Sequence, residues 1–83
     1  MGFAAGHAED VAATHDADEH RQALELGKTL ASERIRRRLS QQELAAAAGV
    51  AQATVSRIER GERLPSLRTL RQLAAAMDLA PFV

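Results

Sequence analysis

Apolar side chains recur at helical spacing from the second quarter of the chain onward. Starting at Leu24, one helical face carries Leu26, Leu30, Ile35 and Leu39, the interval seen when every third or fourth residue packs against a core. The residues before Leu24 are mostly small or polar and show no sustained apolar stripe. The pattern therefore predicts a first helix that begins at Leu24, preceded by a segment without a packed face of its own.

A second, short helix is predicted from its two ends. Ser40 with Glu43 three residues later is the capping-box pattern, in which each side chain accepts a hydrogen bond from the other residue's backbone N–H at a helix start. Gly49 marks the end, because glycine readily adopts the left-handed conformation that closes many helices. This helix is therefore expected to have only about two turns.

Two further helices are expected after the glycine. The third is predicted over residues 51–60, with Val55 and Ile58 on its apolar side. Pro65 disfavours helical geometry in the residue before it, so a loop is expected there. Ser66 then offers a cap to a fourth helix, whose apolar positions are Leu67, Leu70, Leu73, Ala74 and Met77.

The composition agrees with a helical protein. Ala, Leu, Arg, Glu and Gln dominate the 83 residues, and aromatic side chains make up only 2%, which favours helices over sheets. The chain has no cysteine, so no disulfide or thiolate site supports the fold. Pro81 favours a stub of a fifth helix. We expect a compact all-α domain of four to five helices, with one core and a flexible N-terminal leader.

The formal net charge of zero conceals a strong asymmetry. Residues 1–23 contain five acidic residues and one arginine, a net charge of −4, whereas residues 24–83 contain ten Lys or Arg and six acids, a net charge of +4. Such a division is a hint of polyanion binding, although many neutral domains also have charged faces. The chain is therefore expected to comprise an acidic, mobile leader at residues 1–23 and a basic binding domain at residues 24–83.

Several functional classes are disfavoured by the sequence. No apolar run approaches the roughly 20 residues of a membrane span, and the N-terminus does not have the pattern of a signal peptide, so the cytoplasm is the expected location and no membrane partner is expected. All three histidines fall in residues 1–23, and no glycine-rich phosphate loop occurs. We expect no enzyme activity, no catalytic residues, no cofactor and no metal site.

Two short helices joined by a glycine turn are the arrangement in which one helix crosses the DNA backbone and the next enters the major groove. Four blocks occur at matching spacing: LSQQELA at 39–45, GV at 49–50, TVSRIERG at 54–61 and PSLRTL at 65–70. On these residues the chain resembles the lambda-repressor-like helix-turn-helix family, also called Cro/cI or XRE. The resemblance covers residues 26–80 and implies binding to double-stranded DNA.

The resemblance implies a role for individual positions. In the family, the residue at the position of Gln41 binds a DNA phosphate, and the free N–H groups at a helix N-terminus favour an anion. A glutamine amide such as that of Gln52 can pair with adenine, and Arg57 can pair with guanine or hold a phosphate, two alternatives that the sequence leaves open. The expected DNA-binding residues are Gln41, Gln52, Ala53, Thr54, Ser56, Arg57, Arg60 and Arg63.

Two further contacts are expected. The matching family positions imply that Arg34 and Glu59 form a buried or half-buried ion pair between the first and third helices. A single short helix reads few bases, so a homodimer on an inverted repeat is expected. Its surface is expected at the end of the fourth helix and the stub, at Met77, Leu79, Phe82 and Val83; alternatively these residues close the base of the core.

Two positions depart from the family pattern. Arg38 stands where glycine is common, so a strained left-handed residue or a shifted helix boundary is expected there. Ala51 stands where a capping Ser or Thr is common, which weakens the third helix by about 1 kcal/mol if nothing replaces the cap.

Three functions remain open at this point. The leading one is a transcriptional regulator, and specifically a repressor. A second is an antitoxin of the HigA kind, which represses its own operon while the acidic leader covers a basic toxin. A third is a protein-interaction module that has kept the fold and lost DNA binding.

Overall fold

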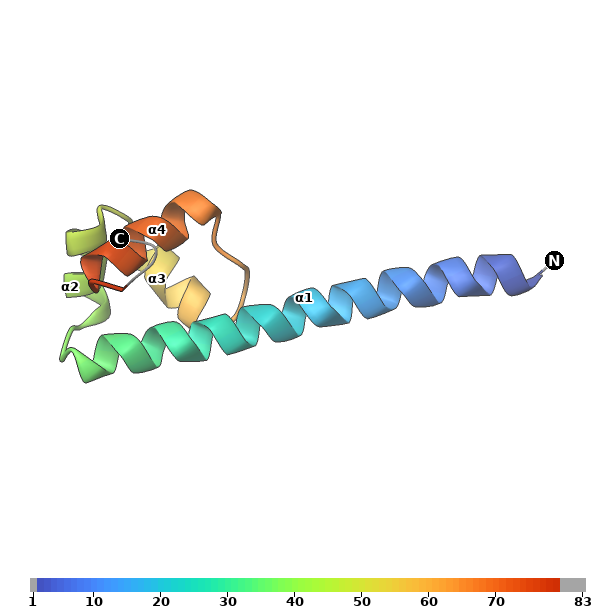
Figure 1. Ribbon diagram of the computed structural model, residues 1–83, viewed down its shortest axis with the longest axis horizontal. Helices are drawn as coiled ribbons and strands as arrows, with labels where there is room; N and C mark the ends of the chain where they lie inside the picture. Colours follow the sequence, from blue (N-terminus) through green and yellow to red (C-terminus); the bar gives the residue numbers. More distant parts are fainter. Residues whose placement is uncertain (1, 80–83) are drawn as a thin grey trace.

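The computed structural model describes the backbone of residues 2–79 and the side chains of residues 17–79. Within this range it has four helices (Figure 1): α1 (Gly2–Arg36), α2 (Gln41–Ala48), α3 (Gln52–Glu59) and α4 (Leu67–Ala76). The described residues contain no strand. The all-α fold class is confirmed, and the stub expected at Pro81 lies outside the described residues.

Helix α1 is much longer than the sequence predicts. It begins at Gly2 instead of Leu24 and runs without interruption to Arg36, so its first half projects beyond the other three helices (Figure 1). The predicted start was wrong because a helix needs an apolar stripe to pack against a core but not to extend beyond it. Once the packed half of α1 has formed, each alanine-rich turn added to it costs little free energy. The boundary expected at residues 23 and 24 falls inside α1, and the division there remains a prediction.

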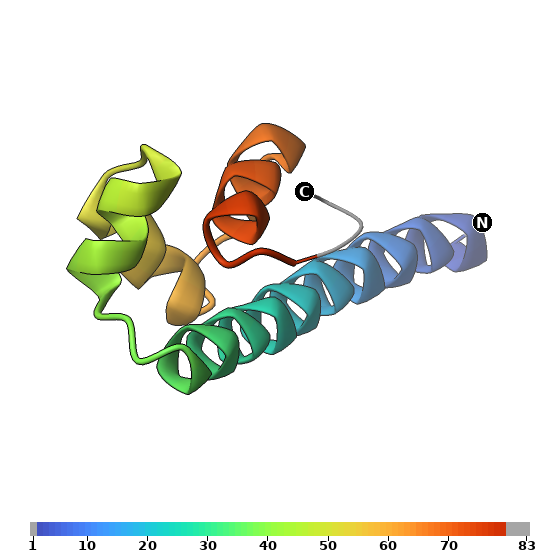
Figure 2. The same cartoon turned by 60° about the vertical axis from the view of Figure 1, so that its left-hand side comes forward.

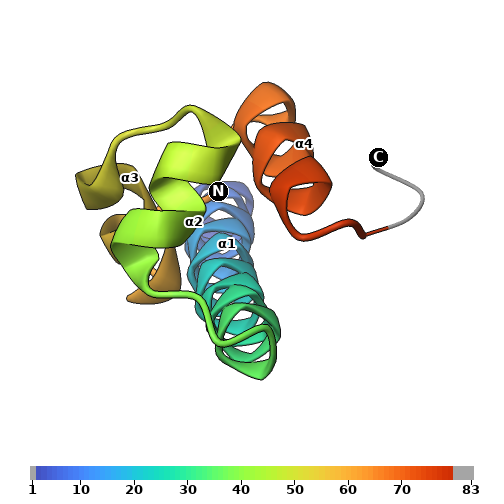
Figure 3. The same cartoon turned by 90° about the vertical axis from the view of Figure 1, so that its left-hand side faces the viewer.

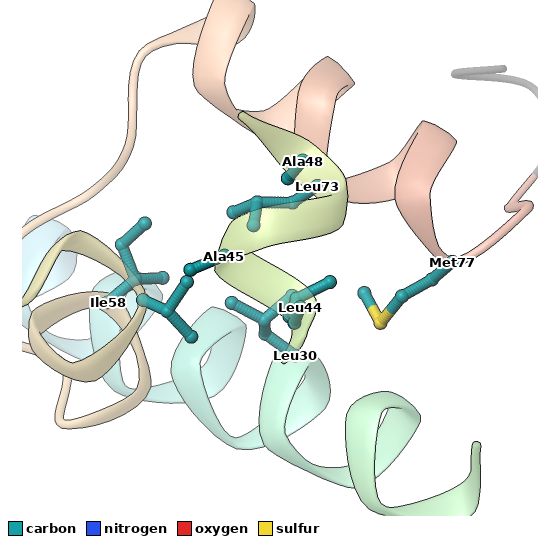
Figure 4. Packing of buried hydrophobic residues seen from close by; sticks show 8 residues of the cluster. Leu30, Leu44, Ala45, Ala48, Ile58, Leu73 and Met77 are labelled. Atoms are coloured by element: carbon teal, nitrogen blue, oxygen red, sulfur yellow. The ribbon is translucent and has the colours of Figure 1, made fainter. Parts of the chain in front are cut away.

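The core lies where α2, α3 and α4 meet the second half of α1. Seen along α1, α3 and α4 lie on opposite sides and α2 lies in front of them (Figure 3). Leu44, Val55 and Leu73 have essentially no exposed surface. Around them pack Leu30 from α1, Ala45 and Ala48 from α2, and Ile58 from α3 (Figure 4). Each fully buried aliphatic side chain stabilises the fold by roughly 1.5–3 kcal/mol.

A backbone contact sets α3 against α1. A Cβ atom added at Gly27 would lie 2.4 Å from the carbonyl oxygen of Ile58 and 2.7 Å from that of Glu59. No side chain fits in this space, so glycine is required where the two helices cross. The crossing fixes the orientation of α3 relative to the rest of the molecule.

The predicted caps of the short helices are present. The Ser40 side chain accepts a hydrogen bond from the Glu43 N–H, and the Glu43 carboxylate accepts one from the Ser40 N–H, both at 2.9 Å. Gly49 ends α2 in the left-handed conformation, with φ of 72°. Ala51 begins α3 without a side-chain cap, as its methyl group dictates.

The end of α4 corrects part of the predicted dimer surface. Met77 is only 2% exposed and belongs to the core, where its long flexible side chain fills the space between α1 and α4. It is therefore a core residue and not a surface residue of the protomer. Leu79 is half-buried against the same core, and Phe82 and Val83 lie outside the described residues.

Candidate nucleic-acid interface

Helices α2 and α3 form a compact pair connected by a short turn (Figure 2). Val55 and Ile58 anchor α3 in the core, which leaves the opposite side of the helix facing solvent. Gln52 and Ala53 are exposed on this side. The full set of predicted α3 residues, all exposed or half-buried, is Gln52, Ala53, Thr54, Ser56, Arg57 and Arg60.

Helical spacing assigns these residues to different parts of the exposed surface. At 100° per residue, Gln52 and Glu59 share one flank, and Thr54 and Arg57 share the opposite flank. The centre of the face belongs to Ala53 and to the residues between the flanks. An exposed helix of two turns is short enough to present this whole face to a major groove.

Arg34 and Glu59 hold α3 onto α1. The Nε of Arg34 donates to Glu59 Oε2 at 2.7 Å and its Nη2 donates to Glu59 Oε1 at 3.0 Å, with side chains only 14% and 7% exposed. Arg34 Nη1 also donates to the carbonyl oxygen of Leu39 at 2.7 Å. The hydrogen bond with Glu59 raises the pKa of Arg34. The pair therefore ties α3 both to α1 and to the segment that leads into α2.

Gln41 makes a contact that the sequence analysis did not predict. Its Nε2 donates to Glu59 Oε1 at 3.0 Å, so the same carboxylate that binds Arg34 also orients the first residue of α2. A side-chain amide carries two hydrogens, and the second one remains available for a phosphate together with the backbone N–H groups of the first turn. The sequence held one indirect signal for this contact. The Glu59 carboxylate, predicted to pair with Arg34, has two oxygens and can accept from a further donor.

The three arginines at the edges of α3 and its loop differ in their partners. Arg60 donates to Ser56 Oγ at 2.9 Å and to Glu62 Oε2 at 3.0 Å, so Ser56 and Arg60 lie together at the centre of the exposed face. Within the described residues, the side chains of Arg57 and Arg63 make no hydrogen bond or ion pair. Their guanidinium groups are therefore free to bind an anion.

The arginines at positions 36–38 have structural roles. Arg37 Nε donates to the carbonyl oxygen of Met77 at 2.8 Å and joins the ends of α1 and α4. Its hydrogen bond to Glu33 lowers the pKa of that carboxyl, and nearby Arg36 lowers it further. Arg38 has the predicted left-handed conformation, with φ of 57°, because the chain must reverse there without a glycine.

Features of other functional classes are not seen in the described part of the chain. Its histidine, aspartate and glutamate residues form no group of three that could hold a metal ion. None of its helices is long and apolar enough to cross a membrane.

Comparison with known proteins finds a matching family model and a similar solved structure. The helix-turn-helix family model HTH_3 matches residues 30–82. The crystal structure of the restriction-modification controller protein C.AhdI from Aeromonas hydrophila is similar, with a TM-score of 0.71 and 34% sequence identity over 74% of this chain and 92% of that one. No curated protein matches the sequence significantly.

Proposed function

The chain belongs to the HTH_3 helix-turn-helix family of DNA-binding transcriptional regulators, and from this premise we propose that it acts as a repressor, binding an inverted-repeat operator as a homodimer. The observation that carries the proposal is the exposed face of α3, held at a fixed angle by the Gly27 crossing and by the Arg34–Glu59 pair. A rigid helix of this kind can place side chains on base edges, and a protein bound over a promoter blocks polymerase.

Sequence recognition is assigned to the exposed residues of α3. Gln52 lies on the α2 flank and can pair with adenine through its amide, and Ala53 can contact a thymine methyl group. Gln41 is assigned to a backbone phosphate, because Glu59 holds its amide at the start of α2. Ser56 and Arg60, hydrogen-bonded to each other at the centre of the face, complete the proposed surface.

Selection from a pool of random DNA duplexes tests this proposal. The expected product is an enriched inverted repeat whose half-site centres lie about one helical turn, roughly 34 Å, apart. On that site, Gln52→Ala should weaken specific binding by about 1–3 kcal/mol while leaving binding to random duplex nearly unchanged, since base contacts discriminate and phosphate contacts position. Gln41→Ala should weaken specific and random binding alike.

Gln22→Ala is the matched control for both variants, because Gln22 is an exposed glutamine on α1 outside the proposed surface. It should bind both duplexes as the unsubstituted protein does. Failure to enrich any sequence would contradict the proposed repressor function and favour a protein-interaction module. Equal losses of discrimination in the Gln41 and Gln52 variants would contradict the two assigned roles.

The dimer is assigned to an apolar groove of about 220 Å³ between α1 and α4. The half-buried side chains of Leu26, Leu70 and Leu79 line it over core residues, and Phe82 and Val83 follow Leu79 closely in the sequence. A stable dimer buries roughly 800 Å² on each partner, so the groove is proposed as the centre of a larger contact with a second copy. Met77 contributes to its floor and not to its rim.

One comparison favours a specific set of target genes. The controller protein C.AhdI, which is similar over most of this chain, is described by its role in restriction-modification. We propose control of restriction-modification genes as the second candidate, to be tested by binding to DNA upstream of any such genes beside this one. No comparison supports the toxin partner of the antitoxin hypothesis.

A further inference from the structure

A small pocket lies between α3, the loop that follows it and the start of α4. Its volume is about 80 Å³. Two arginines and three hydroxyl side chains line it above the buried side chain of Ile58: Thr54, Arg57, Arg63, Ser66 and Thr69. We call it the Arg57–Arg63 pocket.

The lining offers hydrogen-bond donors that have no acceptor. The guanidinium groups of Arg57 and Arg63 have no hydrogen bond or ion pair within the described residues, and the same holds for the Thr54 hydroxyl. The hydroxyls of Ser66 and Thr69 lie 3.1 Å apart and bond to each other, so one of them supplies the proton and the other still has its own to donate.

No carboxylate compensates the two positive charges. None lines the pocket, and the two acids nearest in sequence are engaged elsewhere: Glu59 with Arg34 and Gln41, and Glu62 with Arg60. Two guanidinium groups facing one small space repel each other unless an anion lies between them. The Ser66-capped start of α4, a ten-residue helix, adds a favourable dipole on the same side.

We propose that the Arg57–Arg63 pocket binds one phosphate of the DNA backbone, and that Arg57 contacts this phosphate and not a guanine base. This inference rests on the proposed DNA-binding function and specifies one contact within it. A tetrahedral phosphate offers acceptors to both guanidinium groups at once, whereas a guanine edge accepts from one arginine and leaves the other unpaired.

The position of the pocket agrees with the geometry of α3. Arg57 lies on the flank toward α4, and Glu59, which holds Gln41, lies on the flank toward α2. Phosphate contacts at Gln41 and at the Arg57–Arg63 pocket would position the helix from two sides, and the exposed base-reading residues of α3 would carry the discrimination. Arg57 therefore belongs to the positioning contacts and Gln52 to the reading contacts.

Titration of the free protein with inorganic phosphate tests the pocket without DNA. We expect saturable changes in the backbone amide signals of Thr54, Ser66 and Thr69, absent in Arg57→Gln/Arg63→Gln and absent with chloride at equal ionic strength. Unchanged signals, or the same changes in the double variant, would overturn the proposal. A protein that shows no phosphate binding in this titration can still bind duplex DNA, so this result would not contradict the DNA-binding function. A protein that binds phosphate but no duplex would contradict that function.

The salt dependence of duplex binding separates a phosphate contact from a guanine contact. Each neutralised phosphate contributes about 0.9 to the slope of log K against log salt. The double variant should lower the slope by about one phosphate, because both arginines serve the same one, and neither Arg57→Gln nor Arg63→Gln alone should lower it further than that. Discrimination between the selected site and its base-substituted forms should not change.

Arg71→Gln is the matched control. Arg71 is exposed on α4 outside the pocket, and its substitution removes the same charge. It should leave the amide changes with phosphate intact. Loss of preference for one guanine in Arg57→Gln, with the slope unchanged, would assign Arg57 to the base and overturn the inference. A slope that falls by about two phosphates in the double variant would place the two arginines on separate phosphates and would also overturn the inference.

Discussion

A single carboxylate organises the side of the molecule that is proposed to bind DNA. Glu59 accepts two hydrogen bonds from Arg34 and one from Gln41, so its two oxygens connect α1, the start of α2 and the end of α3. Its side chain is 7% exposed, which makes it costly to leave charged without partners. At this site one residue serves both stability and the placement of a proposed phosphate contact.

The Glu59→Gln substitution should therefore destabilise the fold strongly. It leaves the Arg34 guanidinium, 14% exposed, without a counter-charge, and removing one partner of a buried pair costs about 3–5 kcal/mol. Chemical unfolding monitored by circular dichroism measures the loss. Glu62→Gln is the matched control, because the Arg60–Glu62 pair is 60% and 50% exposed and such pairs contribute under about 1 kcal/mol. Similar losses in the two variants would contradict a buried role for Glu59.

At the scale of the element, α2 depends on its first turn. The helix has only eight residues, too few to be stable in isolation, so its caps and its burial against the core hold it in place. The Ser40 N–H donates to the Glu43 carboxylate and lowers the pKa of that group below its usual value of 4.5. The contact is strongest with the carboxylate charged, next to the positive end of the helix dipole.

This cap predicts a specific pH dependence. Because the pKa of Glu43 is lower in the folded state, its charge stabilises α2 fully above pH 4.5, where it is ionised in both states. As the pH falls below 4.5 the unfolded chain binds the proton first, and the stabilisation is lost as the pH passes the lowered folded value. Thermal midpoints of the unsubstituted protein and of Glu43→Gln should differ at neutral pH and converge in acid. A difference that stays constant with pH would show that charge plays no part in the cap.

At the scale of the whole molecule, the groove between α1 and α4 is an apolar feature of the described surface. Leu26 and Leu70 face it from the two helices, and both are only partly covered within the protomer. Exposed apolar clusters of this kind commonly mark subunit contacts, and closed two-fold dimers are the commonest assembly. The proposed dimer would set the distance between the two copies of α3.

Phe82→Asp should weaken this dimer, because it places a charge in an apolar contact. Sedimentation with and without the selected inverted repeat measures assembly, and the variant is expected to sediment as a monomer and to bind the repeat without cooperativity. Leu67→Asp is the matched control, since Leu67 is 56% exposed on α4 and does not line the groove. A Phe82 variant that still dimerises would rule this surface out. A variant with a lower melting midpoint but unchanged assembly would show that Phe82 closes the core of its own protomer.

The sequence by itself determined the features that depend on residues within about four positions of one another. The capping box of Ser40 and Glu43, the left-handed Gly49, the Ser66 cap and the uncapped Ala51 were all predictable, because each is a contact between neighbours along the chain. The family motifs added the positions of the exposed α3 residues. Hence the order of the helices followed from local patterns, and the identity of the proposed reading helix followed from the family motifs.

The tertiary structure alone decided the features that depend on distant residues. Gln41 meets Glu59 from 18 positions away, and Arg37 reaches the Met77 carbonyl from 40; neither spacing leaves a periodic trace in the sequence. Met77 became a core residue, and Arg57 and Arg63 came to face one pocket, because packing brings α1, α3 and α4 together. Local propensity acts within a helical turn, whereas the partners of a long polar side chain are set by which helices pack against each other.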